Sequence, residues 1–207
     1  MVWDGYEGGE IASSLAIDAA KRYIDNHFGL IDHDKENILD LIKNAIEYAN
    51  TILLDVANGH EELKSMGTTL EICLIYNNRA YIGHIGDSRI YRIRDKFMMK
   101  ITTDHSYVQT LVKDGTITKE EAEHHPKKNM LIKALGCMDD AEPDVLVKNF
   151  KEGDIIVMTS DGLTNMVSED KIYETITEHF EECDKLLVDM ANEAGGVDNI
   201  TVVIIKN

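Results

Sequence analysis

The sequence of 207 residues contains little cysteine, little proline and no long apolar run. Its cysteines, Cys73, Cys137 and Cys183, are odd in number and form no C-x-x-C pair, which excludes a disulfide framework or a zinc ribbon. Two prolines leave no room for a proline-rich linker. No apolar run approaches the roughly 18 residues of a membrane span. The acidic, glycine-rich start is unlike a signal peptide, so we expect a cytoplasmic protein.

Positive charge is also scarce. Lys and Arg number 21 against 38 Asp and Glu, which gives a net charge of −17. A nucleic-acid binder needs cationic side chains to displace counterions from phosphates, and a protein that docks on an anionic membrane needs them as well. The composition therefore excludes both classes. A hydrophobic content of 43% with regular periodicity excludes disorder, and we expect one domain over residues 1–207.

Hydrophobic periodicity predicts an α+β fold. Apolar residues recur at helical spacing over 10–28, 35–57, 104–135, 168–177 and 183–193. Runs typical of strands cover 70–76, 79–85, 89–94, 97–101, 144–150, 154–159 and 200–205. Asn77-Asn78 predicts a tight hairpin, Thr118 with Glu121 a capping box, and Pro126 the first turn of a further helix. Strand runs without regular β-α-β alternation favour antiparallel sheets that pack on each other and are covered by helices.

Four aspartates stand where a predicted strand ends or begins beside glycine: Asp4, Asp87, Asp161 and Asp198. Each one alone is most simply a turn residue. Four carboxylates that converge without cationic partners would repel one another strongly. Hard divalent cations with oxygen ligands relieve that repulsion, which favours Mg²⁺ or Mn²⁺ over Zn²⁺.

The order of six short motifs resembles the bacterial PP2C-type (PPM) metal-dependent serine/threonine phosphatases along nearly the whole chain. The motifs are Asp4-Gly5, Ser65-Met66-Gly67-Thr68-Thr69, Gly86-Asp87-Ser88-Arg89, Thr103-Asp104-His105-Ser106, Ser160-Asp161-Gly162-Leu163 and Gly196-Val197-Asp198-Asn199-Ile200-Thr201. Residues 125–136 also resemble the family's stretch after its flap. The resemblance implies a four-layer α-β-β-α sandwich of two antiparallel sheets flanked by helix pairs, without its first strands and with a flap at about 106–127.

The resemblance also implies a binuclear Mg²⁺ or Mn²⁺ centre. Asp4 would bridge both ions, the Gly5 carbonyl would ligate the first, and Asp161 and Asp198 would hold the second. Asp87 with Asp161 would form a weaker third site. The implied reaction is attack of a metal-bridged water on phosphoserine or phosphothreonine, with no catalytic side chain beyond that water. The implied partners are phosphorylated substrates of a Ser/Thr kinase, and the implied state is a monomer.

The N-terminus departs from the family pattern. Only three residues precede Asp4, whereas the family has a strand pair there with an Arg that recruits phosphate, and Tyr6-Glu7-Gly8-Gly9-Glu10 replaces its Met-Gly-Gly-His block. Two hypotheses follow: a truncated or naturally short enzyme that hydrolyses phosphate esters slowly, or a diverged, non-catalytic module that binds metal and a partner protein. Two other segments resemble metal sites but lack required ligands. A calcium loop at 32–43 needs Gly and Glu where this chain has Asn37 and Lys43. Glu123-His124-His125 has no second cluster at the spacing that a zinc site needs.

Overall fold

The structure, a computed structural model, describes residues 8–207, so the predicted ligands Asp4 and Gly5 lie outside the described residues. The chain forms two compact units. Among the described residues, the first unit contains 8–86 together with Asp104–Asn149, and the second contains Asp87–Thr103 and Phe150–Asn207. Across residues 8–207, no helix combines the length and the apolar character that crossing a membrane requires.

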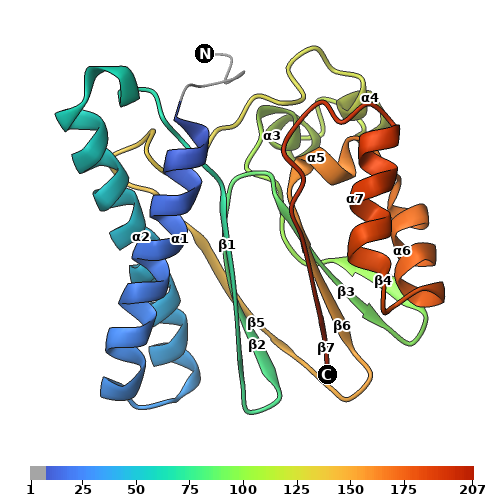
Figure 1. Cartoon of the computed structure of the whole chain (residues 1–207), viewed down its shortest axis with the longest axis horizontal. Coiled ribbons are helices and arrows are strands. Elements are labelled where there is room, and N and C mark those ends of the chain that lie inside the picture. The colour runs from blue at the N-terminus through green and yellow to red at the C-terminus, as the bar shows by residue number, and fades with distance from the viewer. Residues whose placement is uncertain (1–7) are drawn as a thin grey trace. The chain divides into compact units, whose positions relative to one another are not determined.

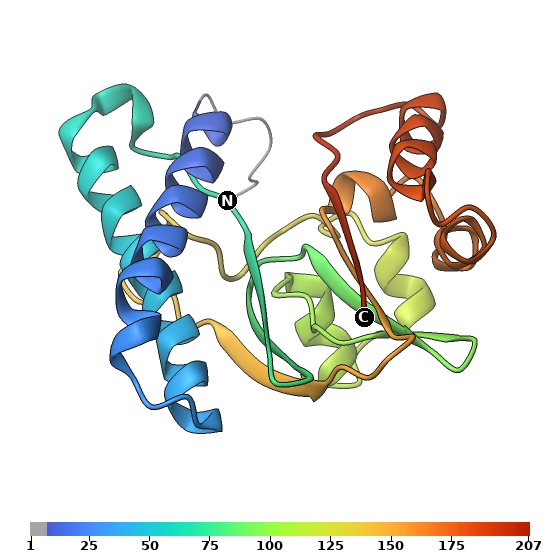
Figure 2. The same ribbon diagram turned by 60° about the horizontal axis from the view of Figure 1, so that its bottom comes forward.

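A three-stranded antiparallel sheet and two long helices make up the body of the first unit. The strands, in spatial order, are β1 (Leu70–Tyr76), β2 (Arg79–Ile85) and β5 (Asp144–Asn149). The helices are α1 (Gly9–His27), α2 (Lys35–Gly59), α3 (Tyr107–Lys113) and α4 (Lys119–Glu123), with 3₁₀ turns at Phe28–Leu30 and Glu61–Leu63. In both views of the chain α1 and α2 run side by side (Figures 1 and 2).

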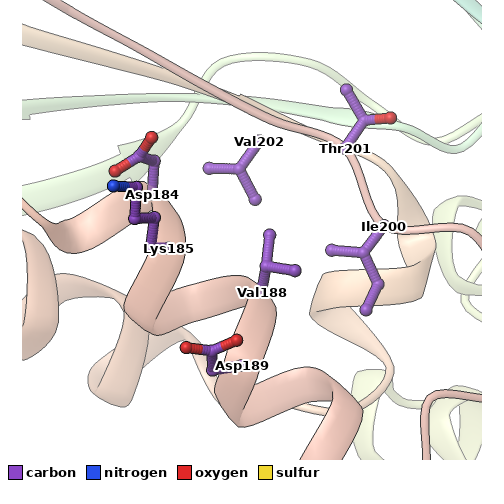
Figure 3. A pocket seen from close by; sticks show the side chains of 7 residues that line it. All are labelled: Asp184, Lys185, Val188, Asp189, Ile200, Thr201 and Val202. Atoms are coloured by element: carbon purple, nitrogen blue, oxygen red, sulfur yellow. The ribbon is translucent and has the colours of Figure 1, made fainter.

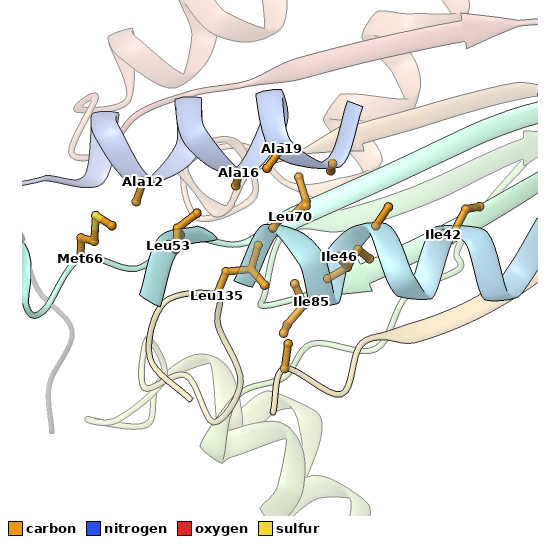
Figure 4. Packing of buried hydrophobic residues seen from close by; sticks show 14 of the residues in the cluster. Ala12, Ala16, Ala19, Ile42, Ile46, Leu53, Met66, Leu70, Ile85 and Leu135 are labelled. Atoms are coloured by element: carbon orange, nitrogen blue, oxygen red, sulfur yellow. The ribbon is translucent and has the colours of Figure 1, made fainter. Parts of the chain in front are cut away.

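The core of the first unit lies between the two long helices and the sheet (Figure 4). Alanines on one face of α1, Ala12, Ala16 and Ala19, let that helix approach α2 closely. The isoleucines of α2 then pack against the sheet. At Gly83 in β2 a Cβ atom would lie 2.4 Å from Ile42 Cγ2 and 2.7 Å from Ile46 Cδ1. Gly83 therefore sets how closely helix α2 can approach the sheet.

We expect Gly83→Ala to lower the free energy of unfolding by about 1–3 kcal/mol, the usual cost of an added methyl group in a well-packed core. Urea denaturation would measure it. Gly59→Ala is the matched control, because a Cβ atom at Gly59, the last residue of α2, meets nothing within 4 Å. Equal effects of the two substitutions would contradict the packing argument.

The second unit contains a four-stranded antiparallel sheet. Its strands, in spatial order, are β4 (Phe97–Lys100), β3 (Arg89–Arg94), β6 (Ile155–Thr159) and β7 (Val202–Lys206). Its helices are α5 (Asp161–Thr164), α6 (Glu169–Glu178) and α7 (Cys183–Glu193). Helices α6 and α7 lie side by side (Figure 1), and Ile172, Ile176 and Leu187 on them pack with Tyr91 and Val157 of the sheet in one buried cluster.

The α+β class and the two antiparallel sheets are confirmed. Asn77 and Asn78 have φ values of 48° and 57°, as the predicted hairpin requires, and Thr118 and Glu121 form the predicted capping box. The helical prediction for 104–135 is confirmed only in part, because α3 and α4 cover only Tyr107–Lys113 and Lys119–Glu123. Pro126 lies in a turn that no helix follows before β5. The short helix α5 at Asp161 was not predicted.

Candidate metal centre

The end of strand β6 is tied to the segment before β7 by one serine. The Ser160 hydroxyl donates a hydrogen bond to the Asn199 carbonyl at 3.0 Å and accepts one from the Thr201 amide at 3.0 Å. The Ser160 amide also donates to the Thr201 carbonyl at 3.1 Å. Ser160 directly precedes Asp161, and Asn199 directly follows Asp198. This double use of one hydroxyl therefore brings the two predicted ligands into the same neighbourhood.

Glycine at position 162 permits the same close approach. A Cβ atom there would lie 2.4 Å from the Asn199 carbonyl oxygen, closer than real Cβ contacts come. The Ser-Asp-Gly order thus has a local explanation: the serine bonds the neighbouring segment, the aspartate presents its carboxylate, and the glycine leaves room for backbone. Of these three residues, only the aspartate could be assigned a role from the sequence.

The electrostatics at Asp161 favour a positive charge beside its carboxylate. Burial, and then the nearby Asp198 carboxylate, raise the pKa of Asp161 above its ordinary value. The Gly162 amide, Arg89 and Asn165 oppose this rise without cancelling it, and Asn165 Nδ2 donates to Asp161 Oδ2 at 3.1 Å. Asp198 Oδ1 accepts the Asn199 amide at 2.7 Å. A buried carboxylate whose ionisation a second carboxylate disfavours, with oxygen atoms as the available ligands, fits a hard divalent cation.

The described residues supply part of a coordination sphere. Within residues 8–207, no three His, Cys, Asp or Glu side chains form a group that could hold a metal ion. Asp87 is half-buried on the turn between β2 and β3 and does not join Asp161 and Asp198 in such a group. Asp4 and Gly5 lie outside the described residues. The paired carboxylates of Asp161 and Asp198 are thus the core of the candidate site.

A second feature, which the sequence analysis missed, is an arginine beside this pair. Arg89 in β3 lowers the pKa of Asp161 by its charge. Its guanidinium Nη1 lies 3.8 Å from Glu169 Oε1, the atom to which the buried Tyr91 hydroxyl donates at 2.9 Å. Glu169 is the first residue of α6 and lies about eighty residues along the chain from Arg89, so only the fold could reveal the contact.

A surface pocket of about 480 Å³ lies between α7 and the start of β7 (Figure 3). Its lining combines apolar and charged side chains: Asp184, Lys185, Val188, Asp189, Ile200, Thr201 and Val202. None of the predicted metal ligands lines it. Neither Asp161 nor Asp198 therefore contributes to this pocket.

Comparisons with known proteins identify the family of this chain. A family model described as "Protein phosphatase 2C" matches residues 4–193. Protein phosphatase PhpP of Streptococcus pneumoniae is 38% identical over 205 residues, which cover 98% of this chain and 81% of that protein. Serine/threonine protein phosphatase PstP of Mycobacterium tuberculosis is 36% identical over 201 residues, covering 97% of this chain and 38% of that protein.

Solved structures match as well. The crystal structure of the Mycobacterium tuberculosis serine/threonine phosphatase PstP/Ppp superimposes with a TM-score of 0.86 at 35% identity, and the match covers 97% of this chain and 83% of that one. The catalytic domain of PstP in complex with two manganese ions matches with a TM-score of 0.81 at 34% identity, over 95% and 80% of the two chains.

The fold and the comparisons together define a phosphoric ester hydrolase of the metal-dependent class. The chain belongs to the protein phosphatase 2C family, and so to the bacterial serine/threonine protein phosphatases of that type.

Proposed function

We propose that this chain hydrolyses phosphoserine and phosphothreonine in proteins, with two Mg²⁺ or Mn²⁺ ions held by Asp4, the Gly5 carbonyl, Asp161 and Asp198. Asp87 with Asp161 would hold a weaker third ion. The observation that carries the proposal is the Asp161 carboxyl group, whose pKa is raised by burial and then by the nearby Asp198 carboxylate. The manganese-bound relative supports the choice of metal.

Bound divalent cations would supply a water of lowered pKa as the nucleophile and would neutralise the phosphoryl oxygens. The chain's own residues position the two carboxylates and contribute to the charge around them. Ser160 and Gly162 hold the two carboxylate-bearing segments together. Arg89, whose Nη1 lies 3.8 Å from Glu169 Oε1, supplies a positive charge that acts on Asp161.

The cysteines take no part in this chemistry. Burial raises the pKa of the Cys73 thiol to about 11 and that of Cys137 to about 12. Burial also raises the pKa of Cys183. A thiol must lose its proton to act as a nucleophile, so at neutral pH these three remain weakly reactive. This supports hydrolysis by activated water over a cysteine-phosphate intermediate.

For the whole chain we infer one phosphatase domain, monomeric, with a flap at about 106–127 and a four-layer α-β-β-α arrangement. Its substrates would be phosphorylated products of a Ser/Thr kinase. The names of the relatives as serine/threonine phosphatases support this substrate class.

The test is hydrolysis of p-nitrophenyl phosphate and of a phosphothreonine peptide by the purified chain with Mn²⁺, with Mg²⁺ and with EDTA. We expect turnover with either metal and none with EDTA. Titration calorimetry with Mn²⁺, run in parallel, distinguishes the alternative. Metal binding without turnover on either substrate would contradict an enzyme and favour a non-catalytic module that binds metal and a partner.

A further inference from the structure

Two histidine rings lie against each other inside the first unit. The rings of His84 and His105 have centroids 4.7 Å apart. The His84 side chain, on β2, is fully buried, and its Nδ1 lies 3.0 Å from Glu71 Oε1 on β1. His105 is itself buried, in the segment that leads to α3. Buried polar groups need hydrogen-bond partners, so each ring nitrogen is expected to have a specific one.

His105 holds Gly86 through both its backbone and its ring. The His105 amide donates to the Gly86 carbonyl at 2.7 Å, and the Gly86 amide donates to His105 Nδ1 at 3.2 Å. The His105 carbonyl in turn accepts the Ile132 amide at 2.8 Å. The ring is therefore fixed on a backbone that is itself hydrogen-bonded on both sides.

The hydrogen bond from Gly86 defines the charge state of the ring. An imidazolium has no acceptor atom, so Nδ1 can accept the Gly86 amide only in a neutral ring whose proton is on Nε2. That Nε2 lies 3.3 Å from Asp144 Oδ2 on β5 and can donate to it. The fold thus selects one tautomer of neutral His105.

Gly86 is held on its other side as well. Its φ is 116°, which residues with a side chain rarely adopt, and a Cβ atom would lie 2.2 Å from Thr69 Cγ2. Position 86 therefore admits no side chain, and neighbouring residues can bind it only through its backbone amide and carbonyl groups. Gly86 is joined directly to Asp87, the proposed ligand of the third ion.

We propose that neutral His105 is a positioning residue, which holds the Gly86 backbone through Nδ1 and so fixes the direction in which the chain continues to Asp87. The proposal deepens the proposed function, on which its consequence for catalysis rests. The contact with Gly86 itself is independent of that function.

A pH dependence follows from the same bond. The groups around the ring are His84 from β2, with Glu71 behind it, Asp144 from β5 and Lys133 from the segment after α4. Burial, and then the positive potential of His84, lower the pKa of His105 below its ordinary value of 6.5, against the opposing effect of Asp144. The neutral ring is present at pH 7. As the pH falls through the lowered value, protonation of Nδ1 breaks the bond to Gly86.

The direct test is the NMR signal of the Gly86 amide in protein labelled with ¹⁵N-glycine, followed between pH 8 and the acid limit of folding. We expect the signal to titrate with a midpoint below 6.5, the ordinary value of histidine. Two isosteric variants separate the ring atoms. His105→Asn places an oxygen where Nδ1 lies, and His105→Gln places its amide where Nε2 lies.

His105→Asn should keep the Gly86 signal near its wild-type position and abolish its titration, whereas His105→Gln should shift it at all pH values. In the Mn²⁺ assay His105→Gln should lower kcat about tenfold, the size of effect that lost support for a metal ligand produces. His105→Asn should retain kcat at neutral pH and should not show the loss of activity that protonation of His105 causes at acid pH. A Gly86 signal that ignores pH, or equal shifts in both variants, would overturn the proposal even if the chain proved inactive.

Discussion

Replacing Asp161 by asparagine is expected to lower Mn²⁺-dependent hydrolysis of a phosphothreonine peptide by about 1,000-fold or more. Metal ions contribute several kcal/mol to stabilising the charge of a phosphoryl transition state, and each 1.36 kcal/mol is about tenfold in rate. Asp161 is one of the two carboxylates that the fold brings together and is shared by the second and third proposed sites. An amide keeps the shape of the side chain and removes its charge. Initial rates over a range of Mn²⁺ concentrations measure the effect.

The same substitution separates metal binding from folding. Because the fold raises the pKa of Asp161, the metal-free protein gains stability from this group as the pH falls toward the ordinary aspartate range. In Asp161→Asn that contribution disappears, so its metal-free stability at pH 7 should equal or exceed that of the wild type. Asp170→Asn, at an exposed position in the first turn of α6, is the matched control. Loss of activity in the control, or full activity in Asp161→Asn, would contradict the assignment.

The sequence predicted those features of the fold that depend on neighbours along the chain. The β1–β2 hairpin was predicted with its strand ends and its Asn77-Asn78 turn, because alternation and positive φ are local properties. The region 104–135 was not, because its apolar residues have helical spacing over short stretches only, and a turn at Pro126 follows α4.

The candidate site divides in the same way. Asp161 and Asp198 could be predicted because strand ends beside glycine are visible in the sequence. The hydrogen bonds around them join residues far apart in the sequence: Ser160 bonds a segment 39 residues away, and Tyr91 bonds Glu169, the neighbour of Arg89, across 78 residues. No spacing rule indicates which hydroxyl meets which carbonyl at such distances. Only the structure reveals such partners, and the same holds for the hydrogen bonds between His105 and Gly86.

The second large effect concerns stability. Asp154→Ala should lower the free energy of unfolding of the second unit, because it removes the counterion and the hydrogen-bond acceptor of the Arg94 guanidinium. Asp154 is 1% exposed. Its Oδ1 accepts Arg94 Nε at 2.6 Å, and its Oδ2 accepts both Arg94 Nη2 at 2.5 Å and the Lys151 amide at 2.6 Å. Its backbone also pairs with Asn207, which anchors the end of β7. Thermal and urea denaturation would measure the loss.

The pH dependence identifies the cause of that loss. The Arg94 guanidinium, and then the Lys151 amide, hold the pKa of Asp154 below its ordinary value against the opposing effect of burial. A carboxyl group with a lowered pKa contributes stability above its ordinary pKa and loses it as the pH falls through the folded value. The difference in unfolding free energy between wild type and Asp154→Ala should therefore be constant at neutral pH and shrink below about pH 4.

Glu152→Ala, at an exposed position in the same turn, should change the unfolding free energy little. The double variant Arg94→Met with Asp154→Leu should recover part of the stability, because it leaves no buried charge. A difference that persists unchanged into acid would mean that Asp154 acts by packing, without a contribution from its charge.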